Sequence, residues 1–582
     1  MKRCPQCNRV ETDDSLGFCR ADGTALVGDS AFIDSEAEKS KRLTPASEIE
    51  TSLLPHRTDA SMGRVTGLTT ELPRTAAHGA GPFAGRKRSQ SVIVIGVVAI
   101  AAIALAIAGY LFTSRGSNAG IESIAVLPFD NRGSKSDTDY LSEGLADSLI
   151  YRLAQLPNLK VSPTSSVLKY KGQPQDAAAI ARELQVDAVM FGRLMQQGDD
   201  LAISVQLIDA RNNKLIWAEQ YERKMADLLV TQREIATAIA QKLQLKLAGD
   251  EAKGITKKYT DNNEAYQLYM KGKYHYAKRT RDDFQKAIDY FQRAVELDPN
   301  FALAYALIAD AYASMPAYPY LSPNDAFPKA KAAAHRAIQL DPTLAEAHTA
   351  LGYSLGLYDW KWNEAETEFR RALELDDKNS LVHLRFAVTY HLPTGRIDQA
   401  IAELERGVEL EPVNLHARAN LSWIYRMAGR KDEALAQGEK LRDLEPEFVL
   451  GRYQLGLIYI ANEMYKEALA LAEKPLRSNP NDQLMLQISG CANAKLGRRV
   501  AANSVISRFK EIGKTQYVIS FFVASIYAAL GEKDKAFVAL EEAYRQRDWR
   551  MSVHLKLDPL IESLRSDARY KDLLRRMNLP EG

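Results

Sequence analysis

The feature that most constrains this chain is the apolar stretch from Val92 to Phe112, which contains 21 consecutive residues without a charge. A helix needs roughly 20 apolar residues to cross the hydrocarbon core of a bilayer. Secretory signal peptides have shorter apolar cores close to the N-terminus, whereas this stretch follows 91 other residues. The sequence therefore predicts one transmembrane helix at residues 92–112.

The basic residues that flank this stretch predict its orientation. Within 20 residues on either side, four precede it and two follow it: Arg74, Arg86, Lys87 and Arg88 before, and Arg115 and Arg132 after. An excess of basic residues before the helix favours a cytoplasmic N-terminus. We therefore expect a single-pass protein of the cytoplasmic (inner) membrane, with the long C-terminal part on the periplasmic or extracytoplasmic side.

The composition is that of a mostly globular protein. Of 582 residues, 46% are hydrophobic and 26% are charged, and the formal net charge is +2. These are ordinary globular values, and so small a net charge gives no broad basic surface that would attract nucleic acid. Three of the four cysteines precede the apolar stretch and only Cys491 follows it, which excludes a disulfide framework on the outer side.

The first 27 residues carry a candidate metal site. Cys4 and Cys7 form a Cys-x2-Cys pair, and Cys19 and Asp22 follow as Cys-x2-Asp-Gly. Zinc needs four ligands in tetrahedral array, and pairs two residues apart on tight turns can supply them. Three thiolates and the Asp22 carboxylate would complete the set, although an unpaired or redox-active Cys-x2-Cys, or a ribbon that has lost its metal, is also consistent with the spacing.

The same residues resemble the short zinc ribbons found at the N-termini of many bacterial membrane and signalling proteins. The resemblance implies a structural zinc rather than a catalytic one, and it covers residues 1–27. Residues 28–91 are rich in Ser, Thr, Ala, Gly and Pro without sustained periodicity. That composition is typical of a flexible linker.

Residues 121–250 show the pattern of an α/β domain. Compact apolar runs and alternating apolar residues predict strands, and amphipathic spacing predicts helices. The expected strands are residues 124–129, 158–162, 188–193, 201–208 and 215–221, and the expected helices are residues 141–153, 177–184 and 226–247.

This order resembles the TolB-like amino-terminal domain of bacterial membrane-linked proteins that carry tetratricopeptide (TPR) repeats. The residues that carry the resemblance are IAVLPFDN (124–131), YLSEGLADSLIYRL (140–153), VDAVMFGRL (186–194), VQLIDARNNKLIWAEQYER (205–223) and REIATAIAQKL (233–243). The resemblance implies an envelope-facing interaction module. Relatives often add a winged-helix DNA-binding domain or a cyclase domain, which this chain lacks, so neither activity follows from the resemblance.

Residues 262–548 repeat with a fixed period. Pro412, Pro446 and Pro480 are each 34 residues apart, which is the period of the tetratricopeptide helix–turn–helix unit. Small residues recur in the same register, and about eight units are expected. Such helix pairs stack into an all-α solenoid with a groove, which we expect to bind proteins or peptides.

Two segments depart from the period. Residues 315–328 are an insertion with four prolines and two tyrosines, Tyr318 and Tyr320, and we expect it to break the helix and project from the edge of the solenoid. Residues 549–582 resemble the closing segment of many TolB-like/TPR chains. They would serve as the polar-faced cap that a solenoid requires.

No catalytic motif emerges from the sequence. There is no His-Glu-x2-His, no Gly-x-Ser-x-Gly and no glycine-rich dinucleotide turn. Glu143 and Asp147 are interpreted as part of a solvated helix face, and Trp360 and Trp362 as packing residues. The chain is therefore not expected to be an enzyme.

Together these features predict a multidomain protein made of a zinc ribbon, one transmembrane helix, an α/β TolB-like domain and a TPR solenoid. The expected function is a membrane-anchored scaffold for protein–protein interaction. The alternative is a transmembrane signalling or regulatory protein, in which binding outside changes what the zinc ribbon contacts inside.

Overall fold

The structure, a computed structural model, describes two main parts of the chain. These are residues 120–131 and 139–243, and residues 255–580, apart from residues 157, 174, 175 and 413; residue 245 and three short N-terminal strands are also described. The chain divides into two units, one formed by residues 1–29 with residues 121–582 and the other by residues 30–120. The predicted transmembrane helix and nearly all of the predicted linker lie outside the described residues. Among the residues that are described, no helix is both long and apolar enough to cross a membrane.

A mixed sheet forms the centre of the α/β domain. Its strands are β4 (Ser123–Val126), β5 (Asp130–Asn131), β6 (Lys160–Val161), β7 (Ala188–Gln197), β8 (Asp200–Asp209) and β9 (Lys214–Lys224). The strand order is β6-β4-β7-β8-β9, and β5 also pairs with β7. Strands β4 and β5 run parallel to their neighbours, whereas β7, β8 and β9 form an antiparallel meander.

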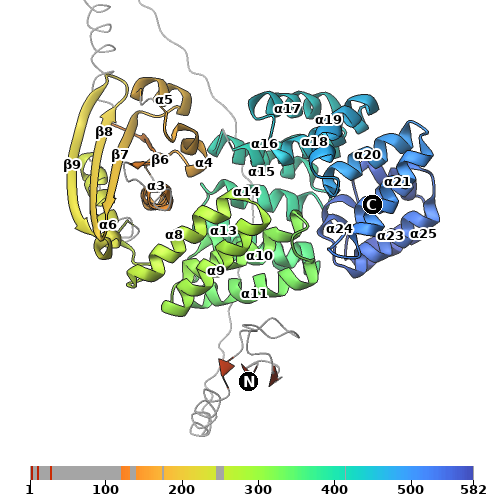
Figure 1. Cartoon of the computed structure of the whole chain (residues 1–582), viewed down its shortest axis with the longest axis horizontal. Coiled ribbons are helices and arrows are strands. Elements are labelled where there is room, and N and C mark those ends of the chain that lie inside the picture. Colours follow the sequence, from red (N-terminus) through yellow and green to blue (C-terminus); the bar gives the residue numbers. More distant parts are fainter. Residues whose placement is uncertain are drawn as a thin grey trace, which may run out of the picture. The chain divides into compact units, whose positions relative to one another are not determined.

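Four described α-helices accompany this sheet, and the first, third and fourth match the three predicted helices. They are α3 (Asp139–Ala154), α4 (Thr164–Val167), α5 (Ala177–Leu184) and α6 (Leu228–Lys242). Helix α5 begins where the Asp176 side chain accepts from two backbone N–H groups and ends where Gln185 adopts a left-handed conformation. Helices α3 and α6 pack on each other, and α6 lies against β9 (Figure 1). The prediction of an α/β domain is confirmed.

In the described residues from α8 to α23, sixteen α-helices form eight consecutive pairs, many of which are labelled in Figure 1. The pairs are α8 (Asn263–Lys278) with α9 (Arg281–Leu297), α10 (Ala302–Ser314) with α11 (Pro323–Leu340), α12 (Ala345–Ser354) with α13 (Trp362–Leu375), α14 (Ser380–Phe386) with α15 (Ile397–Leu410), α16 (Leu415–Met427) with α17 (Lys431–Leu444), α18 (Val449–Ala461) with α19 (Tyr465–Ser478), α20 (Gln483–Lys495) with α21 (Arg499–Ile512), and α22 (Ser520–Ala529) with α23 (Lys533–Arg545). The predicted all-α solenoid is confirmed.

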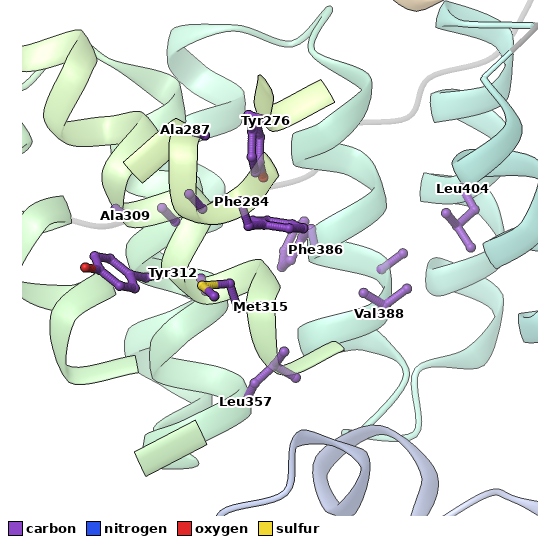
Figure 2. Close-up of a cluster of buried hydrophobic side chains, with 14 of the residues drawn as sticks. Tyr276, Phe284, Ala287, Ala309, Tyr312, Met315, Leu357, Phe386, Val388 and Leu404 are labelled. Atoms are coloured by element: carbon purple, nitrogen blue, oxygen red, sulfur yellow. The ribbon is translucent and has the colours of Figure 1, made fainter. Parts of the chain in front are cut away.

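From the second pair onward, the first helix of each pair packs on the first helix of the next, as α10 does on α12 and α16 on α18. We call the surface formed by these first helices the inner face. Below it the apolar core runs without a break from one pair to the next, and Figure 2 shows part of it, with Tyr276 of α8, Phe284 of α9, Phe386 of α14 and Leu404 of α15.

Beyond the eighth pair the chain continues as α24 (Trp549–His554), the 3-10 helix η7 (Pro559–Leu564) and α25 (Ala568–Arg576). Two short π-helices also interrupt the array, η5 (Leu355–Asp359) after α12 and η6 (Ala387–His391) after α14. Such π turns inside α-helices are frequent at functional sites.

The prediction that the insertion at residues 315–328 projects from the array is wrong. Residues 315–317 form the 3-10 helix η4, and α11 already begins at Pro323, so only the intervening residues form a turn. The rings of Tyr318 and Tyr320 stack on each other and both contact Phe284. The Arg281 guanidinium donates to the carbonyls of residues 319 and 320. The two aromatic rings therefore hold the insertion against the first helix pair.

Close helix contact at one glycine gives a stability prediction. A Cβ atom on Gly272 of α8 would lie 2.4 Å from the ring of Phe291, which is fully buried on α9. We expect Gly272→Ala to lower the free energy of unfolding by about 1–3 kcal/mol, because the ring must move in a packed core. Thermal unfolding measures this loss. Gly513→Ala is the control, since its nearest neighbours at 3.4 Å are in ordinary contact; equal losses for both variants would contradict the prediction.

Candidate interaction site on the inner face

The four predicted zinc ligands lie outside the described residues. Three strands around them are described: β1 (Lys2–Arg3), β2 (Val10–Glu11) and β3 (Val27–Gly28), which pair antiparallel in the order β2-β1-β3. Cys4 and Cys7 belong to the connection between β1 and β2, and Cys19 and Asp22 to the connection between β2 and β3. Elsewhere, within the residues that the structure describes, no group of three or more His, Cys, Asp or Glu side chains could hold a metal ion.

A polar site lies where the last described residues of the chain pack on the inner face. We call residues 547–578 the closing segment. Within it, Ser552 accepts a hydrogen bond from Trp360 Nε1 at 3.0 Å and donates to the carbonyl of Leu357 at 3.0 Å. The Trp362 indole donates to the carbonyl of Met577 at 2.9 Å. Trp360 and Trp362 therefore act as packing residues, as expected, but what they hold is a segment about 200 residues further along the chain.

An arginine at the start of the closing segment strengthens this contact. The Arg547 guanidinium lies 3.8 Å from the centre of the Trp360 ring and donates to the carbonyl of Tyr358 at 3.2 Å. A guanidinium over an indole face combines a cation–π attraction with stacking.

Deeper in the same region, a fully buried group of charges joins the closing segment to α16. Asp558 receives two hydrogen bonds from the Arg426 guanidinium, at 2.9 and 3.1 Å. The second carboxylate oxygen of Asp558 also lies 2.5 Å from His554 Nδ1. The side chains of Arg426 and Asp558 are each only 1% exposed. Two-point contact of a guanidinium with a carboxylate is a strong and directional interaction.

Electrostatics favour the ionised form of the Asp558 carboxyl. Burial opposes ionisation of Asp558, but Arg426 and His554 outweigh it and hold the pKa of this carboxyl well below its usual range. Burial lowers the pKa of His554 despite the neighbouring carboxylate. Because the ionised Asp558 carboxylate can only accept, the His554 ring donates to it from Nδ1.

The π-helices η5 and η6 shape the surface that receives α24. Both contact α24, and they also contact each other. Gly356 of η5 permits this approach, because a Cβ atom there would lie 2.5 Å from the Thr389 methyl group of η6.

A second polar junction joins the α/β domain to the array. Arg152 of α3, only 1% exposed, donates to the carbonyls of Ile255 and Lys257 at 2.8 and 2.9 Å. Desolvation lowers the pKa of this guanidinium. Nearby, Gln232 Oε1 accepts from Ser148 of α3 and from Tyr266 of α8, at 2.9 and 2.8 Å.

Glu143 and Asp147, which the sequence analysis interpreted as part of a solvated helix face, lie near this junction. Asp147 forms an ion pair with Lys273 of α8 and accepts from Thr164. Glu143 pairs with Lys171 at 2.8 Å. The interpretation as a solvated face is therefore wrong for Asp147, because α8 packs directly on α3 and brings a lysine to it.

The same side-chain hydrogen bond recurs at an equivalent position on the first helices of successive pairs. His348, His383, Arg418 and Arg452 each donate from the side chain to the carbonyl of the residue six positions earlier, at 3.1, 2.9, 2.6 and 2.9 Å. These carbonyls follow the preceding helix, where backbone acceptors lack partners. In His348 and His383 the other ring nitrogen faces Glu368 and Glu403, each at 2.6 Å.

The two histidines make the stability of the third and fourth pairs depend on pH. Burial disfavours the imidazolium, but the glutamate and carbonyl partners outweigh it and raise the pKa of both His348 and His383 above 6.5. Stability from these contacts is complete below pH 6.5 and is lost as pH rises through the raised folded-state pKa.

We expect the free energy of unfolding to fall by on the order of 1 kcal/mol per histidine between pH 6 and pH 9. Urea unfolding at both pH values measures it. A variant with both histidines changed to glutamine should lose this part of the pH dependence, and an unchanged difference would contradict the assignment.

Family models match segments within both main parts of the described structure. The family model described as HilA/YgeH-like transcriptional regulator, second domain, matches residues 120–238, and the tetratricopeptide repeat model matches residues 276–301. Together with the eight helix pairs, the second match shows that the array consists of tetratricopeptide repeats.

The chain is also similar to one curated protein, "Putative adenylate cyclase 3" of Rhizobium meliloti (strain 1021). The two are 31% identical over 188 residues, which is 32% of this chain and 32% of that protein. The chain thus spans about a third of the length of the curated relative that it matches.

Solved structures, of which we give two, are similar at low scores. A thermophilic TPR protein of Thermus thermophilus is 19% identical, with 34% of this chain and 99% of that chain covered and a TM-score of 0.29. TolB from Acinetobacter baumannii is 19% identical, with 23% of this chain and 31% of that chain covered and a TM-score of 0.18. These scores are too low to transfer any property to this chain.

Proposed function

We propose that this chain is a membrane-anchored scaffold for protein–protein interaction, which displays a TolB-like domain and a TPR array on the outer side of the cytoplasmic membrane. The observation that carries the proposal is the set of eight tetratricopeptide helix pairs joined to the α/β domain. TPR arrays offer extended surfaces on which a partner protein or peptide can bind.

The junction between the two domains supports a scaffold that presents both surfaces in a fixed arrangement. The contacts of Arg152, Gln232 and Asp147 all cross this junction. Buried hydrogen bonds of this kind resist hinge motion, because opening would leave several polar groups unpaired. A partner could then contact the sheet domain and the array at the same time.

The membrane anchor and the zinc ribbon are the parts of the proposal that rest on sequence. The apolar stretch at residues 92–112 supports a single span, and the basic residues before it support a cytoplasmic N-terminus. For the ribbon, Cys4, Cys7, Cys19 and Asp22 would hold a structural zinc ion. The described strands β1, β2 and β3 support this assignment, since the four residues lie in the two connections between them.

A second candidate function is regulation across the membrane. The observation that favours it is the family match of residues 120–238, whose description names transcriptional regulators. In that case binding outside would change what the zinc ribbon contacts inside. Neither candidate assigns catalysis to this chain, because its sequence carries no recognisable catalytic motif.

Deletion of residues 1–90 separates the two candidates, provided that a start signal and the apolar stretch are kept. A scaffold should retain the function that is lost when the whole protein is removed. A regulator should lose it, because the cytoplasmic ribbon is gone. A deleted chain that inserts normally but shows the full loss would overturn the scaffold proposal in favour of regulation.

The proposed topology predicts the labelling of single cysteines in intact cells. In a parent without its native cysteines, we expect a membrane-impermeant thiol reagent to label Ser117→Cys and not Ser89→Cys, once any outer envelope has been opened. The two residues lie on opposite sides of the apolar stretch, so only one can face the reagent if the stretch spans the membrane. The reverse pattern would place the TPR array in the cytoplasm and contradict both candidates.

A further inference from the structure

The inner face is the surface on which the scaffold function would place a partner, and part of it is already covered. The closing segment contacts η5, η6, α16 and α22, which belong to the third, fourth, fifth and eighth helix pairs. Its residues Met551, Ser552 and Leu555 are completely buried there. A short helix of the same chain thus occupies this part of the inner face.

Capping of the array does not require this arrangement. A cap has to cover only the last helix pair, and α25 already does so. The Arg569 guanidinium lies 4.1 Å from the centre of the Phe537 ring of α23, and Arg576 pairs with Glu541 of the same helix. The contacts of α24 with residues 192 positions earlier in the chain go beyond what a cap needs.

The receiving surface has the chemistry of a binding site. Arg426 supplies a buried guanidinium for a carboxylate, and the rings of Trp423 and Phe521 lie 5.1 and 5.5 Å from the His554 ring. Trp360 and Trp362 each direct an indole N–H at an acceptor in the closing segment. Aromatic rings, an arginine and directed hydrogen-bond donors are the groups that dominate binding energy at protein interfaces.

We propose that the closing segment is the ligand of this part of the inner face, bound within its own chain. The surface is thereby reserved for a short helical segment that brings a carboxylate to Arg426, a ring between Trp423 and Phe521, and acceptors for the two indoles. An external protein gains this surface only by displacing residues 547–578. This last consequence rests on the proposed scaffold function, whereas occupation within the chain does not.

The test uses the full chain and a labelled synthetic peptide of residues 547–580. Binding is followed by fluorescence anisotropy. The wild-type chain should bind the peptide weakly, because its surface is occupied. In the Asp558→Ala chain the resident segment has lost its carboxylate, so the added peptide should bind at least about 100-fold more tightly than it binds to wild type.

Variant peptides and chains control this measurement. A peptide with Asp558→Asn should lose most of the gain in affinity for the Asp558→Ala chain. The native peptide should also lose most of this gain when the Asp558→Ala chain carries Arg426→Met as well. A peptide with Arg575→Gln should bind as the native peptide does, because the Arg575 side chain is 71% exposed.

A second variant guards against a folding defect in the Asp558→Ala chain. Ser552→Ala in the chain removes the hydrogen bonds of this side chain with the Trp360 indole and the Leu357 carbonyl and leaves the receiving surface intact, so it should also raise binding of the native peptide, by about tenfold. Circular dichroism checks that each chain is folded. The proposal is overturned if folded variant chains bind the peptide no better than wild type, or if the Asp558→Asn peptide binds equally well. No external partner enters the experiment, so a failed search for one would bear on the scaffold function alone.

Discussion

Replacing Asp558 by alanine is expected to lower the free energy of unfolding of the array by about 3–5 kcal/mol. The variant leaves the Arg426 guanidinium buried without its carboxylate, and it also removes the partner of His554 Nδ1. An uncompensated buried charge is among the most destabilising changes in a folded protein. Urea unfolding followed by circular dichroism measures the loss.

Two further variants test whether loss of the Arg426–Asp558 ion pair causes the lower free energy of unfolding. Glu473→Ala removes an ion pair with Arg477 whose side chains are 60% and 76% exposed, and we expect a change below about 0.5 kcal/mol. Arg426→Met combined with Asp558→Leu removes both charges and should recover most of the stability. If the single and double variants were equally unstable, packing and not the buried charge would explain the loss.

The second large effect is expected at Arg152, in the junction between the α/β domain and the array. Arg152→Ala removes two charge-assisted hydrogen bonds to the Ile255 and Lys257 carbonyls and leaves these acceptors without the guanidinium. We expect a loss of about 2–4 kcal/mol. Because the contact joins two domains, the loss should appear in calorimetry as separation of one transition into two.

Arg182→Ala is the matched control in the same domain. Arg182 lies on α5, is exposed, and donates only to the carbonyl of Ala178 in its own helix. Its removal should leave the calorimetric trace nearly unchanged. A single transition that shifts as a whole in the Arg152→Ala chain would show that the two domains unfold together even without this contact.

Sequence patterns predicted the elements of the α/β domain well because those patterns are local. The predicted helix at residues 177–184 is observed as α5 with the same bounds, and the predicted strand at residues 201–208 lies within β8. Apolar alternation and turn residues determine such elements within a few positions of themselves. The 34-residue period likewise predicted the helix pairs, because each pair packs mainly on its neighbours.

The polar site between the closing segment and the inner face could not be predicted from the sequence. Its residues are far apart in the chain and come together only in the folded structure. His554 and Asp558 are four residues apart and resemble one polar face of a cap, yet Asp558 pairs with an arginine 132 positions earlier. Nothing around Arg426 in the sequence distinguishes it from a solvated arginine. The insertion was mispredicted for a related reason, since its prolines suggested a projecting loop while Phe284 provides a surface that holds Tyr318 and Tyr320. The zinc ligands and the membrane span stay predictions.

The contact of Trp360 with Ser552 also determines when during synthesis the protein can be completed. Helix pairs can fold from local contacts as soon as their own residues are available, whereas this contact must wait for 192 further residues. At the usual 5–20 residues per second, that wait lasts roughly 10 to 40 s. Until the closing segment arrives, Trp360, Trp362 and Arg426 have no partner in it. A chain whose synthesis stops after the last helix pair would keep these side chains uncovered permanently, and chaperones and proteases could recognise it by them.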